Sequence, residues 1–313
     1  MLKAPLIRWL VLIYLVLLGP GFSLAQTADQ FQQTGIIYYQ RGDLKQALAA
    51  FSRAIQMDSK SALAHTNRGL VRYKMGDMTG ALSDHNQAIK LDPNLPEAYT
   101  NRGGVRLAQG DRDGALADHS KSIALNPKNV EAYSNRGLVR LAKGNADGAI
   151  QDFDKALELD PYYPRGARSY TNRATAHLQK ASTLKGQLAV KELTKGIKDC
   201  TNALILDPNL AEAYNIRGLT YMKSVELNPS QAIRLGFHTK ALGDFENAIR
   251  INPRLALSYL NRGILRVRLR NFTDALKDLR TAVKLLPRLK TSATPWIQWA
   301  KTQLARAERD KEG

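Results

Sequence analysis

Arginine and aspartate recur through this 313-residue chain in two columns of equivalent positions, whose charges could bind an anion or pair with each other. In successive copies of one pattern, the first column holds Thr34 once and arginine in every later copy. The second column holds Ala50 in that same first copy and aspartate in every later one. This covariation favours charge-assisted hydrogen bonds within each copy, and therefore structural arginines rather than phosphate ligands. The expected ion pairs are Arg68–Asp84, Arg102–Asp118, Arg136–Asp152, Arg173–Asp199, Arg217–Asp244 and Arg262–Asp278.

A third column could recognise another polypeptide. Its residues in successive copies are Gln33, Asn67, Asn101, Asn135, Asn172, Ile216 and Asn261. An asparagine side chain offers a carbonyl acceptor and two N–H donors, so it can bond both backbone groups of an extended peptide. One such residue per copy would read the peptide backbone rather than its sequence. The alternative is that these side chains cap or bridge neighbouring helices.

The elements that position these columns follow from the period. An aromatic residue or histidine opens each copy, at Phe31, His65, Tyr99, Tyr133, Tyr170, Tyr214 and Tyr259, with steps of 34, 34, 34, 37, 44 and 45 residues. Such a period is typical of a solenoid whose units stack on their neighbours. In the third copy, residues 97–109 and 113–125 predict two helices, because Gly110 separates them and Pro127 follows the second.

Small residues recur inside the first helix of each copy, where we expect the backbone of the second helix to approach closely. They are Gly35, Gly69, Gly103, Gly137, Ala174, Gly218 and Gly263. The layout resembles the tetratricopeptide repeat family over about residues 29–287, although arginine precedes the glycine and His85 and His119 fill a usual aromatic column. The resemblance implies an all-α, right-handed solenoid of seven helix-turn-helix repeats. It also implies that the asparagine column lines a concave groove, with Asn261 beyond the gap at Ile216.

The sequence divides into three predicted parts: a signal peptide at 1–25, a seven-repeat solenoid at 26–290 and a C-terminal capping helix with a tail at 291–313. Two repeats are lengthened, at about 168–253, and their extra residues at 182–195 and 224–236 should project from one edge. Thr294 followed by Pro295 is typical of a helix N-cap with proline at the first helical position. Trp296 and Trp299 lie on the stripe expected to cover the end of the stack.

The first residues predict export. Lys3 and Arg8 form a basic start, residues 9–18 are uninterruptedly apolar, and small residues precede a cleavage site after Ala25. We therefore expect a periplasmic or secreted protein. Ten apolar residues fall short of the roughly 20 that span a bilayer. The alternative is an uncleaved N-terminal segment that anchors the chain in a membrane.

The remaining chemistry argues against an enzyme. Cys200 is the only cysteine, which excludes an intrachain disulfide, and it takes a column held elsewhere by phenylalanine, so we expect a buried packing residue. The five histidines lack metal-ligand spacing, and the chain has no glycine-rich phosphate loop, activated-serine motif or two-cysteine metal pair. We expect no metal and no cofactor.

The charge points to acidic partners or anionic surfaces. The net charge is +18 at pH 7, and residues 254–290 alone hold ten Lys and Arg against Asp274 and Asp278, a net of +8. The sequence therefore predicts an exported, non-catalytic scaffold or assembly factor that binds protein or extended peptide segments of acidic or mixed charge. One alternative is an envelope-associated adaptor whose basic segment contacts anionic lipid or glycan. Nucleic-acid binding is a third possibility, weakened by export and by the pairing of the arginines.

Overall fold

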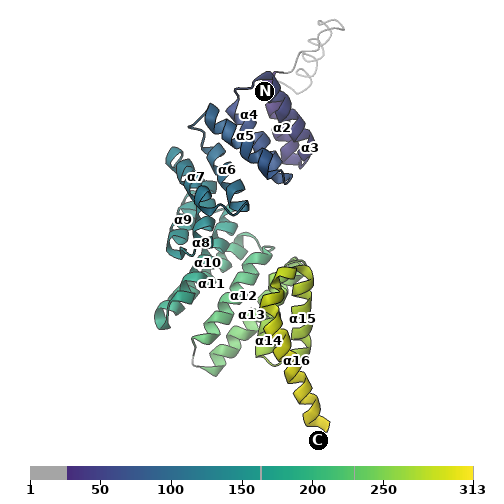
Figure 1. Ribbon diagram of the computed structural model, residues 1–313. Coiled ribbons are helices and arrows are strands. Elements are labelled where there is room, and N and C mark those ends of the chain that lie inside the picture. The colour runs from purple at the N-terminus through teal and green to yellow at the C-terminus, as the bar shows by residue number, and fades with distance from the viewer. Residues whose placement is uncertain (1–26, 163, 229, 313) are drawn as a thin grey trace, which may run out of the picture. The chain divides into compact units, whose positions relative to one another are not determined.

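The computed structural model describes residues 27–162, 164–228 and 230–312 (Figure 1). The regular structure within these ranges consists of fifteen α-helices and one 3₁₀ turn, which confirms the predicted all-α class. The signal peptide expected at 1–25 lies outside the described residues. None of the helices in the described ranges is both long and apolar enough to cross a bilayer.

The chain divides into two compact units, residues 1–105 and 106–313. In the first unit, α2 (Ala28–Arg41) packs on α3 (Leu44–Met57), and α4 (Ala62–Lys74) packs on α5 (Met78–Leu91). The two hairpins join because α3 also packs on α4. Helix α6 (Pro96–Ala108) begins in this unit. Its bounds differ by one residue from those predicted from the sequence.

The second unit continues the alternation of hairpins. Its helices are α7 (Arg112–Leu125), α8 (Val130–Ala142), α9 (Ala146–Leu159), α10 (Arg165–Thr183), α11 (Gly186–Leu206), α12 (Ala211–Glu226), α13 (Gln231–Ile251), α14 (Ala256–Arg268), α15 (Phe272–Leu285) and α16 (Lys290–Glu312). Helices α8 and α9, α10 and α11, α12 and α13, and α14 and α15 form the hairpins, and each hairpin packs on the next. Most first helices also contact each other, since α10 packs on both α8 and α12 and α12 packs on α14.

The turns inside the hairpins explain why the helices stop where they do. Gly110 has a φ of +86°, a left-handed conformation that costs glycine little, and Asp111 then caps α7 by accepting a hydrogen bond from the Gly114 N–H. The same arrangement recurs at Asp77 and Asn145, which cap α5 and α9. The glycine and the capping residue that follows it therefore end one helix and begin the next in each of these repeats.

The small-residue column lies at the hairpin interface, but its neighbour differs from the predicted one. A Cβ added to Gly137 would lie 2.7 Å from the Phe153 ring, and one added to Gly35 would lie 2.6 Å from the Phe51 ring. The glycine therefore makes room for a side chain of the second helix rather than for its backbone. The residues that meet the column in this way are Phe51, His85, Phe153, Phe245 and Leu279.

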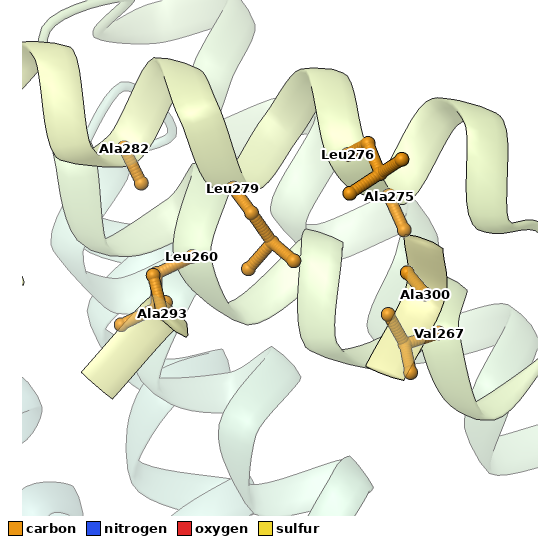
Figure 2. Packing of buried hydrophobic residues seen from close by; sticks show 8 residues of the cluster. All are labelled: Leu260, Val267, Ala275, Leu276, Leu279, Ala282, Ala293 and Ala300. Carbon is orange, nitrogen blue, oxygen red and sulfur yellow. The ribbon is translucent and has the colours of Figure 1, made fainter. Parts of the chain in front are cut away.

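Helix α16 covers α15 and also contacts α14. Ala293 and Ala300 of α16 are fully buried among residues of the two preceding helices, in a cluster made of Leu260, Val267, Ala275, Leu276, Leu279, Ala282, Ala293 and Ala300 (Figure 2). The predicted N-cap at Thr294 is wrong: the helix begins at Lys290 and contains Pro295 in its interior. The preceding 3₁₀ turn and the burial of Ala293 hold the residues before the proline in helical conformation.

Candidate peptide-binding site

A pocket of about 340 Å³ lies between α8 and α10, the first helices of successive repeats. Its lining residues are Val130, Glu131, Ser134, Asn135 and Leu138 from α8, and Arg168, Ser169 and Asn172 from α10. Two members of the asparagine column thus line one cavity. Pockets of this size suit a small ligand or a short stretch of polypeptide.

The polar groups of this pocket are available to a ligand. Asn135 and Asn172 are half-buried, and neither amide makes a hydrogen bond to another side chain or backbone group of the described residues. Ser134 Oγ lies 3.5 Å from Ser169 Oγ and links the two helices. Arg168 is exposed and adds a positive charge to the lining. The pocket therefore offers two amides, hydroxyls, the carboxylate of Glu131 and the guanidinium of Arg168 beside the apolar Leu138.

The other members of the asparagine column differ from these two in their location or in their hydrogen bonds. Asn67 and Asn101, on α4 and α6 of the first unit, are also half-buried, and their contact with a peptide stays a prediction. Asn261 is 8% exposed and donates through Nδ2 to Asn215 Oδ1 at 3.0 Å. Ser258 Oγ lies 3.2 Å from the same oxygen. The structure places Asn261 in a buried polar cluster, so it is not part of the candidate site.

The arginine and aspartate columns meet within the hairpins. The shortest arginine-to-carboxylate distances are 2.7 Å for Arg68–Asp84, 2.7 Å for Arg136–Asp152, 2.6 Å for Arg173–Asp199, 2.8 Å for Arg217–Asp244 and 2.8 Å for Arg262–Asp278. The aspartates are 2–5% exposed, so each pair is largely shielded from water. These arginines are engaged in packing the hairpins and are poor candidates for anion binding.

The sixth expected pair joins residues of the two units and stays a prediction. Within the first unit, Arg102 Nη1 donates to Asn86 Oδ1 at 2.9 Å. Within the second unit, Asp118 Oδ2 accepts from Arg106 Nη1 at 2.8 Å. Both residues therefore have polar partners inside their own units.

Sequence reasoning missed two further partners of this ion-pair system. In four repeats, the residue four positions after the first arginine is a second arginine, which donates to an aspartate of the second column at 2.8–2.9 Å; these are Arg72, Arg106, Arg140 and Arg266. Three residues before the first arginine, a tyrosine ring lies 5.4–5.8 Å from the guanidinium; these are Tyr99, Tyr133, Tyr170, Tyr214 and Tyr259. Both spacings are visible in the sequence, as one helical turn on either side of the arginine column.

Two other features of the sequence are Cys200 and the basic segment 254–290. Cys200 is fully buried, and burial raises the pKa of its thiol, so it stays protonated. Within residues 27–162, 164–228 and 230–312, no cluster of three His, Cys, Asp or Glu side chains could hold a metal ion. In the basic segment 254–290, Arg262 and Arg266 bind Asp278, and Arg268 binds Glu226 at 3.2 Å. Asp278 is already included in the segment's net charge of +8, and Glu226, which lies outside the segment, offsets one further positive charge.

The comparisons agree with this architecture. The TPR repeat model matches residues 35–76 and 71–110, and a second model, Tetratricopeptide repeat, matches residues 100–164. Tetratricopeptide repeats are thus recognised in this chain. Proteins built from them are generally protein-interaction scaffolds. No curated protein sequence matches the chain.

Solved structures are similar to large parts of the chain. A tetratricopeptide repeat protein from Parabacteroides merdae has a TM-score of 0.62 at 19% identity, covering 88% of this chain and 98% of its own. A thermophilic TPR protein in Thermus thermophilus has a TM-score of 0.56 at 17% identity, covering 65% and 100%. The APC/C hetero-tetramer Cut9-Hcn1 contains a chain with a TM-score of 0.66 at 12% identity, covering 90% of this chain and 50% of that one. At these identities the likeness concerns the fold alone, and the predicted tetratricopeptide-type fold is confirmed.

Proposed function

We propose that this protein is a non-catalytic scaffold that binds extended segments of partner proteins in the pocket between α8 and α10, in a compartment to which it is exported. The observation that carries the proposal is the pair of amides, Asn135 and Asn172, which line one cavity without bonding to the described residues around them. A half-buried amide that leaves its hydrogen bonds unused inside the protein is poised to bond an incoming backbone.

The energetics suit a binder of low sequence specificity. Each asparagine can accept from a peptide N–H and donate to a peptide C=O, and each such bond contributes a net ~0.5–1.5 kcal/mol. Two asparagines therefore supply several kcal/mol whatever the side chains of the peptide. Leu138 adds an apolar contact, and Arg168 and Glu131 place both signs of charge in the lining, which suits segments of acidic or mixed character.

Export is supported by the N-terminal sequence, with its basic start, apolar residues 9–18 and small residues up to Ala25. The test is the mass of the chain recovered from the envelope fraction of an exporting host. A mature chain that begins at Gln26 is the expected result. A chain that retains residues 1–25 in the membrane fraction would support the anchored alternative instead.

The test of the groove uses peptides selected by the wild-type chain from a random-sequence library, with affinity measured by fluorescence anisotropy. Replacing Asn135 and Asn172 by alanine should lower the affinity for these peptides by at least about tenfold, because up to four hydrogen bonds are lost. The matched control replaces Asn94 and Asn209, which lie in exposed turns, and should leave affinity unchanged.

Salt separates this proposal from binding through charge. Neutral hydrogen bonds are screened weakly, so affinity should fall little as ionic strength rises, whereas binding by the basic segment 254–290 should fall steeply. A double variant that binds as tightly as the wild-type chain, or a wild-type affinity that collapses in salt, would contradict a role for the α8–α10 pocket.

A further inference from the structure

The two lengthened hairpins carry surface that no other repeat has. Helices α10 and α11 contain 19 and 21 residues, and α12 and α13 contain 16 and 21, whereas the helices of the other hairpins contain 13 or 14. Helix α11 packs against α12, so the two hairpins are neighbours. Their extra turns project beyond the adjoining repeats in the same direction (Figure 1). We name residues 180–191 and 227–240 the hairpin tips.

The hairpin tips expose apolar side chains. Leu188 is 62% exposed on the first tip, and Leu235 and Ile233 are 63% and 48% exposed on the second. Residues 231–236 are all exposed, so the first turn and a half of α13 buries none of its side chains against the rest of the chain. Large exposed apolar residues that are grouped on a projecting end are typical of an interaction surface.

The charge of the hairpin tips has a single sign. The described residues of 180–191 and 227–240 include no Asp or Glu. Lys185, Lys191 and Arg234 are exposed, and none of the three forms an ion pair with a described residue. The pKa of His238 is lowered, first by burial and then by the charges of Arg268 and Arg234, which is consistent with a positive potential at the second tip.

We infer that the hairpin tips dock this protein on an anionic lipid surface. The apolar side chains would enter the boundary between headgroups and acyl chains, and the lysines and arginine would lie beside lipid phosphates. A protein interface is usually one continuous patch with polar residues of both kinds at its rim, whereas here the apolar residues are divided between two projecting ends with cations only. A deformable, negatively charged bilayer fits this arrangement better than a rigid protein partner.

This inference is independent of peptide binding, because the tip residues are not among those that line the α8–α10 pocket. The two proposals can fail separately. Variants of the hairpin tips should keep the peptide affinity of the wild-type chain, and variants of Asn135 and Asn172 should keep its lipid affinity. The protein would then hold a peptide segment while resting on a membrane surface.

The first experiment asks whether a tip enters lipid. In the full chain, Leu235→Cys is labelled with a polarity-sensitive fluorophore; Cys200 is fully buried, so the engineered thiol is the accessible one. Ile205→Cys is the matched control, because Ile205 is 73% exposed at the opposite end of α11. Vesicles of phosphatidylcholine mixed with phosphatidylglycerol should shift the emission at position 235 to the blue, while position 205 and pure phosphatidylcholine vesicles should give no shift.

The second experiment asks which charges attract the lipid. Lys185→Gln, Lys191→Gln and Arg234→Gln together should weaken binding to the anionic vesicles by about fivefold per charge. Arg280→Gln, Lys284→Gln and Arg288→Gln remove the same charge from exposed positions of the basic segment and should cost far less. Every variant keeps residues 9–18, so that apolar segment contributes equally to all.

Three outcomes would overturn the inference. An unchanged emission at position 235 on anionic vesicles would leave the hairpin tips as a protein-contact surface. An equal shift at positions 235 and 205 would mean that lipid binding is not local to the tips. A control triple variant that loses as much affinity as the tip variant would place the lipid contact on residues 254–290. Unchanged helical circular dichroism and melting temperature are required of each variant before its binding is compared.

Discussion

The first helices of successive repeats meet at two sites where asparagine has opposite roles. Between α8 and α10, Asn135 and Asn172 line an open pocket and bond to none of the described residues. Between α12 and α14, Asn215 Oδ1 accepts from Asn261 Nδ2 at 3.0 Å and from Ser258 Oγ at 3.2 Å, and all three residues are buried. One site offers its hydrogen bonds to a partner, and the other uses them to join two helices.

The residue that precedes the asparagine column accounts for the difference. Ser134, just before Asn135 in α8, is the equivalent residue at the open site, and its hydroxyl lies 3.5 Å from Ser169 Oγ without bonding to the Asn172 amide. Asn215 occupies the same preceding position in α12, and its longer side chain reaches across to Asn261. A short hydroxyl side chain at the preceding position does not bond to the asparagine of the next repeat, whereas an amide side chain does. The chemistry of one neighbouring column thus decides whether a repeat binds outward or inward.

The largest expected effect tests whether the buried ion pairs in the repeats of the two sites contribute equally to stability. In the repeat of the open site, Asp152 accepts from Arg136 and Arg140 at 2.7 and 2.9 Å. In the repeat of the buried asparagine site, Asp278 accepts from two arginines at 2.8 Å. Asp152→Ala and Asp278→Ala should each lower the free energy of unfolding by about 3–5 kcal/mol, because each leaves two shielded guanidinium groups without their carboxylate.

Urea unfolding measures both variants beside Asp113→Ala. The Asp113 carboxylate is 87% exposed beside Lys143, so its loss should matter far less than that of either buried aspartate. Equal costs for Asp152 and Asp278 would locate the difference between the sites in the amides alone. A loss of unfolding free energy for Asp278→Ala well above that for Asp152→Ala would show instead that the ion pairs near the buried asparagine site are the stronger ones.

The next effect separates the two amide sites directly. Asn215→Ala removes the oxygen that two buried donors share, and should cost about 2–3 kcal/mol of unfolding free energy. Asn172→Ala removes a side chain with no such bond, and should stay within about 0.5 kcal/mol of the wild-type chain. Thermal or urea unfolding of the two variants decides. Similar losses at both positions would mean that Asn172 holds the fold rather than a partner.

Much of the fold followed from the sequence because it depends on local chemistry repeated at a fixed period. The glycine turns, the polar helix caps and the arginine–aspartate covariation each involve residues of one hairpin, so the pattern of a single copy predicts them. The lengthened hairpins were visible in the same way, as extra residues between two helices. The start of α16 was not, because packing of Ala293 outweighs the usual position of Pro295.

The candidate site was predicted in part. The column that contains Asn135 and Asn172 was found from the spacing, but the burial of Asn261 was not, because it depends on Asn215 in a neighbouring repeat. The second arginine present in four of the repeats, such as Arg140, was missed because the first column already balanced the aspartates in number. Predicting contacts between repeats requires the geometry of the stacked helices, which the spacing of a single column of residues does not give.

His119 extends the comparison, because its imidazole is a buried polar group that makes no hydrogen bond to the described part of the chain. Neither ring nitrogen of His119, on α7, bonds to another described residue, and burial lowers its pKa from 6.5 to about 4. The unfolded chain takes up a proton below about pH 6.5 and the folded chain does not. Stability should therefore fall as the pH drops from 6.5 towards 4, by about 2 kcal/mol near pH 5.

His119→Phe should remove that dependence, since phenylalanine fills the same column at Phe153 and Phe245. The measurement is urea unfolding of both chains near pH 7.5 and pH 5. The variant's advantage should be small at the higher pH and grow by about 2 kcal/mol at the lower one. An advantage that does not change with pH would show that His119 is protonated, or bonded, in the folded protein.

The smallest effect asks whether the open site ends where the asparagine column breaks. Ile216 is half-buried on α12, which packs on α10, and it takes the column position after Asn172. Ile216→Asn would add a third amide to the column, and one further hydrogen bond is worth a net ~0.5–1 kcal/mol. Affinity for an extended peptide should then rise about two- to fivefold, but only for peptides long enough to pass from α8 over α10 to α12. Ile216→Ala is the matched control, because it loses the same apolar contact without adding an amide. If the alanine and asparagine variants bind long peptides equally well, the column does not continue onto α12, and the groove is confined to the pocket of Asn135 and Asn172.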